Sequence, residues 1–217
     1  MTSRESSKIF PDPKFSDPDG LICAGLDLSP DILLEAYHNG IFPWYSRGDP
    51  ILWWCPDPRF VLFPDRLKVS KSMEALIRSG KFSFSLNTDF EGVIRECSVV
   101  DRKGQDGTWI HSEMIEAYTT LHKMGFAICG EARLEGELVG GFYGVKLGKV
   151  LFGESMFSKV SNASKFAFIS YVRKYRDDLA LIDCQVPTEH LRTLGAEFIS
   201  RPEFLNFIKK YTGSQSG

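Results

Sequence analysis

Glu154 is the residue whose surroundings in the sequence point most directly to chemistry. It follows the apolar run 150–152 (VLF) and Gly153, so we expect it at the end of a buried strand. Removing a carboxylate from water is costly unless the group is paired or hydrogen-bonded. Two explanations stay open for Glu154: an ion pair with a nearby Lys or Arg, or a bound ligand.

Two tryptophans follow segments that can present an aromatic ring to a ligand. Trp44 comes directly after Pro43, inside a segment rich in aromatic residues and proline, residues 40–64. Trp109 comes after the charged, Gly-containing stretch 101–107 (DRKGQDG). Each ring can stack on a planar ligand, but packing of Trp109 beneath the next helix explains that residue equally well.

A polar triplet, Asp183-Cys184-Gln185, follows the apolar residues 179–182 (LALI). On the residues alone, the triplet is most simply a strand end that meets a turn. Carboxylate and amide side chains at such an end can also orient a substrate through hydrogen bonds. The triplet alone does not decide between these interpretations.

The composition places these residues in a globular protein. The chain has 217 residues, of which 43% are hydrophobic and 25% charged, so we expect a packed core. Five cysteines without a CxxC pair favour free thiols in a reducing compartment, and four scattered histidines give no support for a metal site. No signal peptide or membrane-spanning run is apparent. We therefore expect a cytoplasmic protein with no membrane partner.

The periodicity and capping signals predict alternating helices and strands. The expected helices cover residues 29–40, 70–79, 87–97, 112–124, 162–175, 188–194 and 204–211, with Asn87 or Thr88 capping the third and Asn162 the fifth. The expected strands cover residues 82–86, 126–134, 138–145, 150–152, 179–183 and 198–199. A tight hairpin over 138–152 among such elements predicts a mixed sheet in an α+β fold.

One architecture that fits is the acetyltransferase-like (GNAT) fold, preceded by a small N-terminal domain. We place the boundary between residues 1–58 and residues 59–217. A GNAT enzyme binds acetyl-CoA through a loop of the pattern Arg/Gln-x-x-Gly-x-Gly/Ala between a strand and a helix. The nearest stretch, residues 122–127 (HKMGFA), lies at a helix end and has the wrong first residue. Acyl-CoA as the donor is therefore poorly supported.

Eight motifs resemble the leucyl/phenylalanyl-tRNA–protein transferase family, in that family's order and spacing from about Gly20 to Glu203. They are GIFPW (40–44), DPILWWCPDPR (49–59), TWI (108–110), LVGGFYG (138–144), GESMFS (153–158), NASK (162–165), LIDCQ (181–185) and LGA (194–196). The combination GESMFS, NASK and LIDCQ is very specific.

The resemblance implies transfer of Leu or Phe, and also Met, from aminoacyl-tRNA to proteins that begin with Arg or Lys. Such transfer marks those proteins for degradation by the N-end rule pathway. The resemblance further implies a GNAT-like C-terminal domain that uses no metal, nucleotide or other cofactor, and we expect a monomer. Because the donor ester is already activated, holding the amine and the carbonyl together can supply ~7–11 kcal/mol of the barrier.

The family's functional residues carry over to named positions. Asp183 and Gln185 become the catalytic pair, with Gln185 orienting the attacking amine and Asp183 orienting or polarising Gln185. Glu154 becomes a substrate-site residue that meets either the amine or the basic side chain of the acceptor. Trp44 and Trp109 become aromatic contacts at the tRNA 3′ end, each worth ~1–3 kcal/mol per stacked base.

The resemblance also implies an apolar pocket for the transferred side chain and a basic surface for the tRNA. The pocket lining comprises Phe142, Leu151, Phe168, Tyr171 and Ile182, although ordinary core packing remains open for each. The basic surface for the acceptor stem comprises Lys159, Lys165, Arg173, Lys174 and Arg176. An apolar pocket separates neighbours that differ by a methylene only ~10–200-fold, so Leu, Phe and Met should all enter.

The chain departs from the family pattern in one stretch, residues 126–132, and at two single positions. Residues 126–132 read FAICGEA where family members read roughly HAHSVE-W. Leu151 and Tyr171 stand where Phe is common, which predicts an altered preference between Leu and Phe. Two other functions remain open: an acetyl-CoA-dependent acetyltransferase, and a non-catalytic module that binds aminoacyl-tRNA or degrons.

Overall fold

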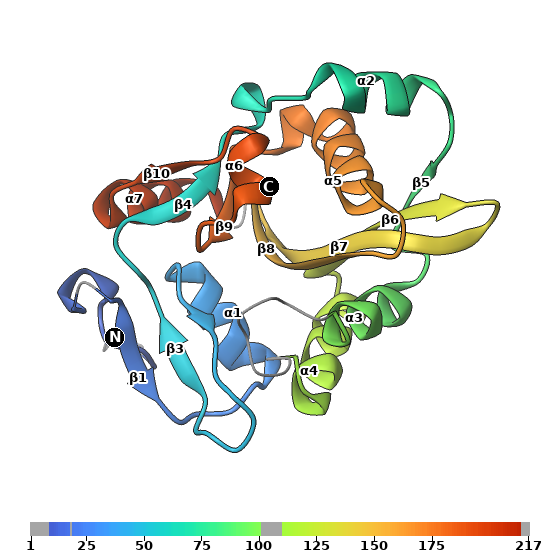
Figure 1. The fold of residues 1–217 in the computed structure, drawn as a ribbon. Coiled ribbons are helices and arrows are strands. Elements are labelled where there is room, and N and C mark those ends of the chain that lie inside the picture. The colour runs from blue at the N-terminus through green and yellow to red at the C-terminus, as the bar shows by residue number, and fades with distance from the viewer. Residues whose placement is uncertain (1–8, 18, 101–109, 214–217) are drawn as a thin grey trace.

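The computed structural model describes residues 9–17, 19–100 and 110–213, and it contains two sheets (Figure 1). The small N-terminal sheet has the order β1-β3-β2, from Leu21–Ala24, Leu52–Trp54 and Phe42–Pro43, and all its pairs are antiparallel. Helix α1 (Pro30–His38) lies between β1 and β2 in the chain, with Pro30 at its first position as expected.

The larger sheet has the order β10-β4-β9-β8-β7-β6-β5. Its strands are β4 (Arg59–Leu62), β5 (Ser83–Leu86), β6 (Ala127–Leu134), β7 (Glu137–Leu147), β8 (Val150–Ser158), β9 (Leu181–Gln185) and β10 (Glu197–Ile199). Its helices are α2 (Lys71–Arg78), α3 (Phe90–Ser98), α4 (Ser112–Lys123), α5 (Ala163–Lys174), α6 (Glu189–Thr193) and α7 (Arg201–Tyr211). Short 3-10 helices are η1 (Pro13–Phe15), η2 (Pro64–Arg66) and η3 (Arg176–Asp178). The predicted α+β class is confirmed.

Helices cover both faces of the larger sheet. Helix α5 packs on β6 and β7 from one face, whereas α3 and α4 lie on the other (Figure 1). Tyr37 of α1 and Trp53 of β3 share a buried cluster with Phe152 of β8. The small sheet ends at Trp54 and the larger one begins at Arg59. The N-terminal unit therefore packs against the larger sheet through a common core.

Near the centre of the larger sheet, the parallel strands β8 and β9 pair over a short stretch and then separate. Strands β8 and β9 pair over three positions, from Val150 opposite Leu181 to Phe152 opposite Asp183. Beyond Phe152, β8 continues alongside β7 as far as Ser158, while β9 ends at Gln185. Beyond Phe152, β8 is therefore paired with β7 alone. The space between the diverging strands β8 and β9 can hold side chains and ligands.

A bulge sets the position of Glu154 on β8. Tyr143 pairs with Ser155 and Gly144 pairs with Gly153, so Glu154 is the extra residue between them. Gly144 makes this possible, because a Cβ there would lie 2.2 Å from the carbonyl oxygen of Phe152. The expectation that β8 stops at residue 152 is therefore wrong, and Glu154 lies within the strand.

One predicted helix cap is confirmed in position and another is wrong. Asn162 is the N-cap residue of α5, but its backbone is left-handed (φ 68°) and its side chain forms no capping hydrogen bond. Instead, the Ser158 hydroxyl accepts a hydrogen bond from the Ser164 backbone N–H at 2.9 Å. Helix α3 is capped by Asp89, which accepts from the Gly92 N–H at 2.9 Å. Thr88, one of the two expected caps, instead contacts a buried carboxylate on β6.

Candidate active site

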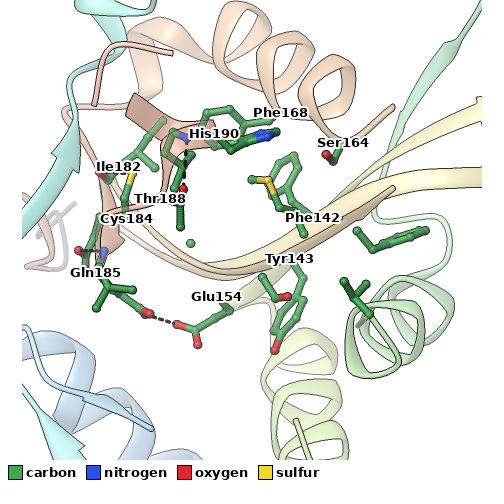
Figure 2. A pocket seen from close by; sticks show the side chains of 18 of the residues that line it. Phe142, Tyr143, Glu154, Ser164, Phe168, Ile182, Cys184, Gln185, Thr188 and His190 are labelled. Atoms are coloured by element: carbon green, nitrogen blue, oxygen red, sulfur yellow. Dashed lines mark hydrogen bonds between the residues drawn. The ribbon is translucent and has the colours of Figure 1, made fainter. Parts of the chain in front are cut away.

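A cavity of about 520 Å³ opens where β8 and β9 separate. Its volume lies in the range of ligand pockets. Figure 2 shows Phe142 and Phe168 on one side of the cavity, with Glu154 and Gln185 facing each other below them. Other lining residues are Phe42, Pro43, Trp44, Val100, Tyr143, Gly153, Ser155, Met156, Phe157, Ser158, Ser164, Ile182, Asp183, Cys184, Val186, Thr188, His190 and Leu191. The arrangement joins an apolar space to a polar one.

Asp183 is held by an arginine that sequence reasoning used only to mark a domain boundary. The Arg59 guanidinium donates from Nε to Asp183 Oδ1 at 2.8 Å and from Nη2 to Oδ2 at 2.7 Å. Both side chains are fully buried. A bidentate pair of this kind fixes the plane of the carboxylate as well as its charge. Asp183 is therefore an ionic anchor at the end of β9.

Gln185 has a backbone conformation that needs support. Its φ is 61°, in the left-handed region that costs ~1–3 kcal/mol for a residue other than Gly. Its backbone N–H donates to Asp183 Oδ1 at 2.9 Å, and its side-chain Nε2 donates to Glu154 Oε1 at 2.9 Å. Because an ionised carboxylate only accepts hydrogen bonds, the NH₂ end of the amide faces Glu154 and the carbonyl oxygen is turned away.

Glu154 is surrounded by neutral donors. The Tyr37 hydroxyl donates to its Oε1 at 2.7 Å and the Tyr118 hydroxyl to its Oε2 at 3.2 Å. The two phenol oxygens lie 2.5 Å apart. Burial raises the pKa of Glu154, the hydrogen bonds from the two tyrosines lower it, and the result is a pKa of about 7. Such a carboxyl can exchange a proton near neutral pH.

The two explanations left open for Glu154 can now be compared. Within residues 9–17, 19–100 and 110–213, no Lys, Arg or His forms an ion pair with Glu154. The negative charge of Asp183 raises the pKa of Glu154 further. In the described part of the chain, three neutral hydrogen bonds, from Tyr37, Tyr118 and Gln185, stabilise Glu154 in place of a local ion pair.

The apolar part of the cavity includes three of the five residues predicted to line it, Phe142, Phe168 and Ile182. Leu151 and Tyr171 do not line this cavity, which corrects the predicted lining. Leu151 is completely buried, and the ring of Tyr171 packs edge-on against Phe142 at 5.4 Å. Both lie in the core behind the lining, because α5 covers that face of the sheet.

The predicted aromatic contacts have different outcomes. Trp44 lines the cavity with 38% of its surface exposed, and its carbonyl oxygen accepts a hydrogen bond from Trp54 Nε1 at 2.8 Å. An exposed indole at the rim of a cavity can stack on a planar group. Trp109 lies outside the described residues.

The five basic residues predicted to bind tRNA lie on the surface, and most already have partners. Lys159 donates to Glu96 at 2.6 Å, Arg173 pairs with Glu74, and Arg176 pairs with Asp65 at 2.7 Å. Lys165 donates to the Thr193 hydroxyl at 3.4 Å. Lys174 lies over the Tyr175 ring at 5.4 Å. Exposed ion pairs are weak and exchangeable, so these pairs leave the predicted role untested.

Sequence reasoning missed Arg59, Tyr37 and Tyr118 as parts of the site. Tyr37 and Tyr118 have the spacing of the apolar helix faces, where a phenol ring packs like that of Phe. Their hydroxyls meet Glu154 only because α1 and α4 lie on the same side of β8. Arg59 carries a stronger signal, since a buried Arg in a strand needs an acidic partner.

Three further findings bear on other classes of site. In the part of the chain that the structure describes, no group of three or more His, Cys, Asp or Glu is arranged to hold a metal ion. None of the helices described is long and apolar enough to cross a membrane. All five cysteines are free.

Two family models and several known proteins match this chain. Residues 61–209 match the family model described as leucyl/phenylalanyl-tRNA protein transferase, and residues 26–57 match the model of its N-terminal domain. A leucyl/phenylalanyl-tRNA–protein transferase from Christiangramia forsetii is 54% identical over 202 residues, which cover 92% of this chain and 95% of that protein. One from Myxococcus xanthus is 51% identical over 211 residues, or 97% and 90% of the two chains.

Among solved structures, a GCN5-related N-acetyltransferase from Kribbella flavida aligns with 79% of this chain and 61% of its own. The TM-score is 0.39 and the sequence identity 10%.

Proposed function

This chain belongs to the leucyl/phenylalanyl-tRNA–protein transferase family, and from that premise we propose that it moves Leu or Phe from aminoacyl-tRNA to proteins beginning with Arg or Lys. The observation that carries the proposal is the Gln185–Glu154 hydrogen bond at the edge of an apolar cavity. The transfer marks acceptors for the N-end rule pathway. The protein acts as a monomer in the cytoplasm, where charged tRNA is available.

The donor enters through its amino-acid side chain. Phe142, Phe168 and Ile182 give the apolar space that a Leu, Phe or Met side chain fills. An apolar space of this kind rejects charged side chains, but separates similar apolar ones only ~10–200-fold. Trp44 stacks on the terminal adenine, which is worth ~1–3 kcal/mol. Trp109 is proposed for the same end of the tRNA.

The acceptor amine meets the polar edge of the cavity. An N-terminal amine has a pKa of about 7.7–8.0, so it arrives largely as an ammonium ion at neutral pH. Ionised Glu154 accepts one of its protons, and the Gln185 carbonyl oxygen accepts a hydrogen bond from the resulting neutral amine. The amide itself removes no proton, because an amide is too weak a base. Gln185 orients the nitrogen toward the ester carbonyl.

The bond changes then balance without a cofactor. The amine nitrogen forms a C–N bond with the ester carbonyl, and the C–O bond to the terminal ribose breaks. The second amine proton ends on the departing ribose oxygen, directly or through water. Since the ester is already activated, placement of the two reactants supplies most of the acceleration.

A preference for basic acceptors is supported by the charges around the cavity. The residues described as lining the cavity include two acidic ones, Glu154 and Asp183, and no Lys or Arg. Asp183 is already neutralised by Arg59. Glu154 accepts two hydrogen bonds on Oε1 and one on Oε2, which leaves room for one further donor on Oε2. We assign that place to the amine and leave the basic side chain to the outer rim.

The acceptor stem of the tRNA meets the exposed basic residues. Lys159, Lys165, Arg173, Lys174 and Arg176 contact phosphates, exchanging their exposed carboxylate partners for phosphate oxygens. Such contacts predict that the KM for aminoacyl-tRNA rises steeply with salt. They predict no effect of stem sequence.

The test is a transfer assay with radiolabelled Leu-tRNA, Phe-tRNA and Met-tRNA and peptides that differ only in the first residue. We expect label on peptides beginning with Arg or Lys, and none on those beginning with Asp or Glu. Gln185→Ala should reduce kcat, whereas Glu137→Gln, an exposed change on β7, should have no effect. Label on Asp or Glu peptides alone would overturn the acceptor class, and acetylation from acetyl-CoA would overturn the donor.

A further inference from the structure

Arg59 is a fully enclosed charged residue beside the cavity. Its side chain has no exposed surface, and its guanidinium lies 4.7 Å from the centre of the Phe42 ring and 4.5 Å from that of Phe204. The guanidinium is thus held between two rings while its edge forms the bidentate pair with Asp183. Stacking and a planar fork are both properties of Arg that Lys does not share.

The contacts of Arg59 lead directly to the strained residue of the site. Asp183 Oδ1 accepts from Arg59 Nε at 2.8 Å and from the Gln185 backbone N–H at 2.9 Å. The register of β4 against β9 is irregular at this point, with Phe60 opposite Gln185 and Val61 opposite Asp183. One oxygen therefore connects the guanidinium to the backbone of Gln185, whose φ is 61°.

Arg59 also joins three separate parts of the fold. Phe42 belongs to the N-terminal unit and lines the cavity two residues before Trp44. Phe204 belongs to α7, and Asp183 belongs to β9. An arginine at this junction links the proposed platform for the tRNA end to the residue that orients the amine.

We infer that Arg59 is a positioning residue for the transfer reaction: through Asp183 it holds the Gln185 backbone in its left-handed conformation, so that the side-chain amide points at Glu154 and the acceptor. The inference rests on the proposed function. It assigns Asp183 an anchoring role, because both of its oxygens accept hydrogen bonds from Arg59 and one of them also holds the Gln185 backbone N–H.

The first test is Arg59→Lys, which keeps the charge but can replace only one of the two donors. We expect kcat to fall about 10- to 100-fold, the equivalent of one lost charge-assisted hydrogen bond. The KM for Phe-tRNA should stay unchanged. Arg66→Lys is the matched control, since Arg66 also pairs with a carboxylate, Glu197, and stacks on a ring, Phe63, but at the surface. An unchanged kcat in Arg59→Lys would overturn the inference.

The second test is a double-mutant cycle of Arg59→Met and Asp183→Asn. A single change leaves one buried group without its partner, whereas the double change removes both charges, which a protein often tolerates well. If Arg59 acts through Asp183, the double variant should lose no more kcat than Asp183→Asn alone. Losses that multiply would mean that Arg59 acts independently of Asp183 and would refute the inference.

The third measurement needs no activity. Hydrogen exchange of the Gln185 backbone amide should be slow in the natural protein and about 10- to 100-fold faster in Arg59→Lys, with the amides of β6 unchanged. Equal exchange in the two proteins would count against the positioning role. The natural protein could instead transfer nothing, while exchange of the Gln185 amide still becomes faster in Arg59→Lys. That result would refute the proposed function and leave the structural link between Arg59 and Gln185 intact.

Discussion

Two glutamates on the same sheet, Glu131 on β6 and Glu154 on β8, are both buried and have opposite acid–base properties. Burial alone would raise the pKa of Glu131, but hydrogen bonds from Thr88, Ser85 and Arg133 outweigh it and lower the pKa to about 2. Burial raises the pKa of Glu154 to about 7, because the hydrogen bonds from Tyr37 and Tyr118 compensate only part of the cost.

The difference lies in the donors. Glu131 accepts from the backbone N–H groups of Thr88 at 2.6 Å and Asp89 at 2.9 Å, and forms an ion pair with Arg133 at 2.9 Å. Glu154 accepts from two phenols and one amide, all neutral. A carboxylate with a cation and backbone donors is a fixed structural charge. A buried carboxyl group with neutral donors alone can gain or lose its proton near physiological pH.

The largest expected effect comes from replacing Glu154, the carboxyl group that exchanges a proton near neutral pH. Glu154→Gln keeps the shape and loses the proton acceptor, so we expect kcat/KM for an Arg-initiated peptide to fall on the order of 10²–10³-fold. Steady-state transfer from Phe-tRNA measures it, with Glu137→Gln as control. A loss of less than tenfold would mean that Glu154 is no proton acceptor and that its environment serves packing alone.

The structural carboxylate should show the reverse pattern. In Glu131→Gln, the amide NH₂ faces donors on Thr88, Asp89 and Arg133, and the unpaired groups should cost about 2–3 kcal/mol of the free energy of unfolding. Urea denaturation measures that loss. The kcat of the folded fraction should remain unchanged, and a drop in kcat like that of Glu154→Gln would erase the distinction between the two residues.

The dependence of stability on pH separates the two residues by sign. The folded-state pKa of Glu154, about 7, is above its ordinary 4.5, so its contribution to stability is fully present below 4.5 and is lost as the pH rises through 7. The contribution of Glu131 is present above 4.5 and is lost as the pH falls through 2.

Between pH 5 and 8, the natural protein should therefore lose roughly 2–3 kcal/mol of unfolding free energy relative to Glu154→Gln. Relative to Glu131→Gln it should lose none in that window. Denaturation curves of the three proteins at both pH values give the differences directly. Parallel behaviour of all three would show that the two carboxyls titrate alike.

Several elements of this fold follow from local signals, and the site follows from them only in part. Ser70 accepts from the Met73 N–H and starts α2 as its sequence predicts. The apolar runs around Gly136 and Gly148 predict the hairpins of β6, β7 and β8. Phe142, Phe168, Ile182 and Trp44 all reach the cavity. The expectation that these four residues line the site comes from the family resemblance and not from a local pattern.

The errors arise where distant segments decide. Strand β8 continues past Gly153 because the bulge opposite Gly144 keeps it paired with β7. Leu151 is as apolar as Ile182 and belongs to the same buried cluster, yet only Ile182 reaches the cavity. Tyr37, Arg59 and Tyr118 lie far apart in the chain, and no local pattern predicts that they surround Glu154 and Asp183. The chemistry of the site is therefore a property of the topology.

The smallest predicted effect distinguishes the two phenols that contact Glu154. Tyr37 donates at 2.7 Å to Oε1, the oxygen that also accepts from Gln185, whereas Tyr118 donates at 3.2 Å to Oε2. Each hydrogen bond lowers the pKa of Glu154, so removing either hydroxyl should raise that pKa. The acid limb of the pH profile of kcat/KM should then move to higher pH, by more in Tyr37→Phe than in Tyr118→Phe.

The expected loss in kcat/KM at pH 7 is about 3- to 10-fold for Tyr37→Phe, and smaller for Tyr118→Phe, in keeping with one neutral hydrogen bond. At pH 9, where Glu154 is ionised in all three proteins, the rates should converge. Equal losses at pH 7 and pH 9 would mean that the phenols position the substrate directly. Convergence would mean that the phenols act by shifting the pKa of Glu154. The residues around Glu131 cannot have such an effect, because Glu131 has already lost its proton at both pH values.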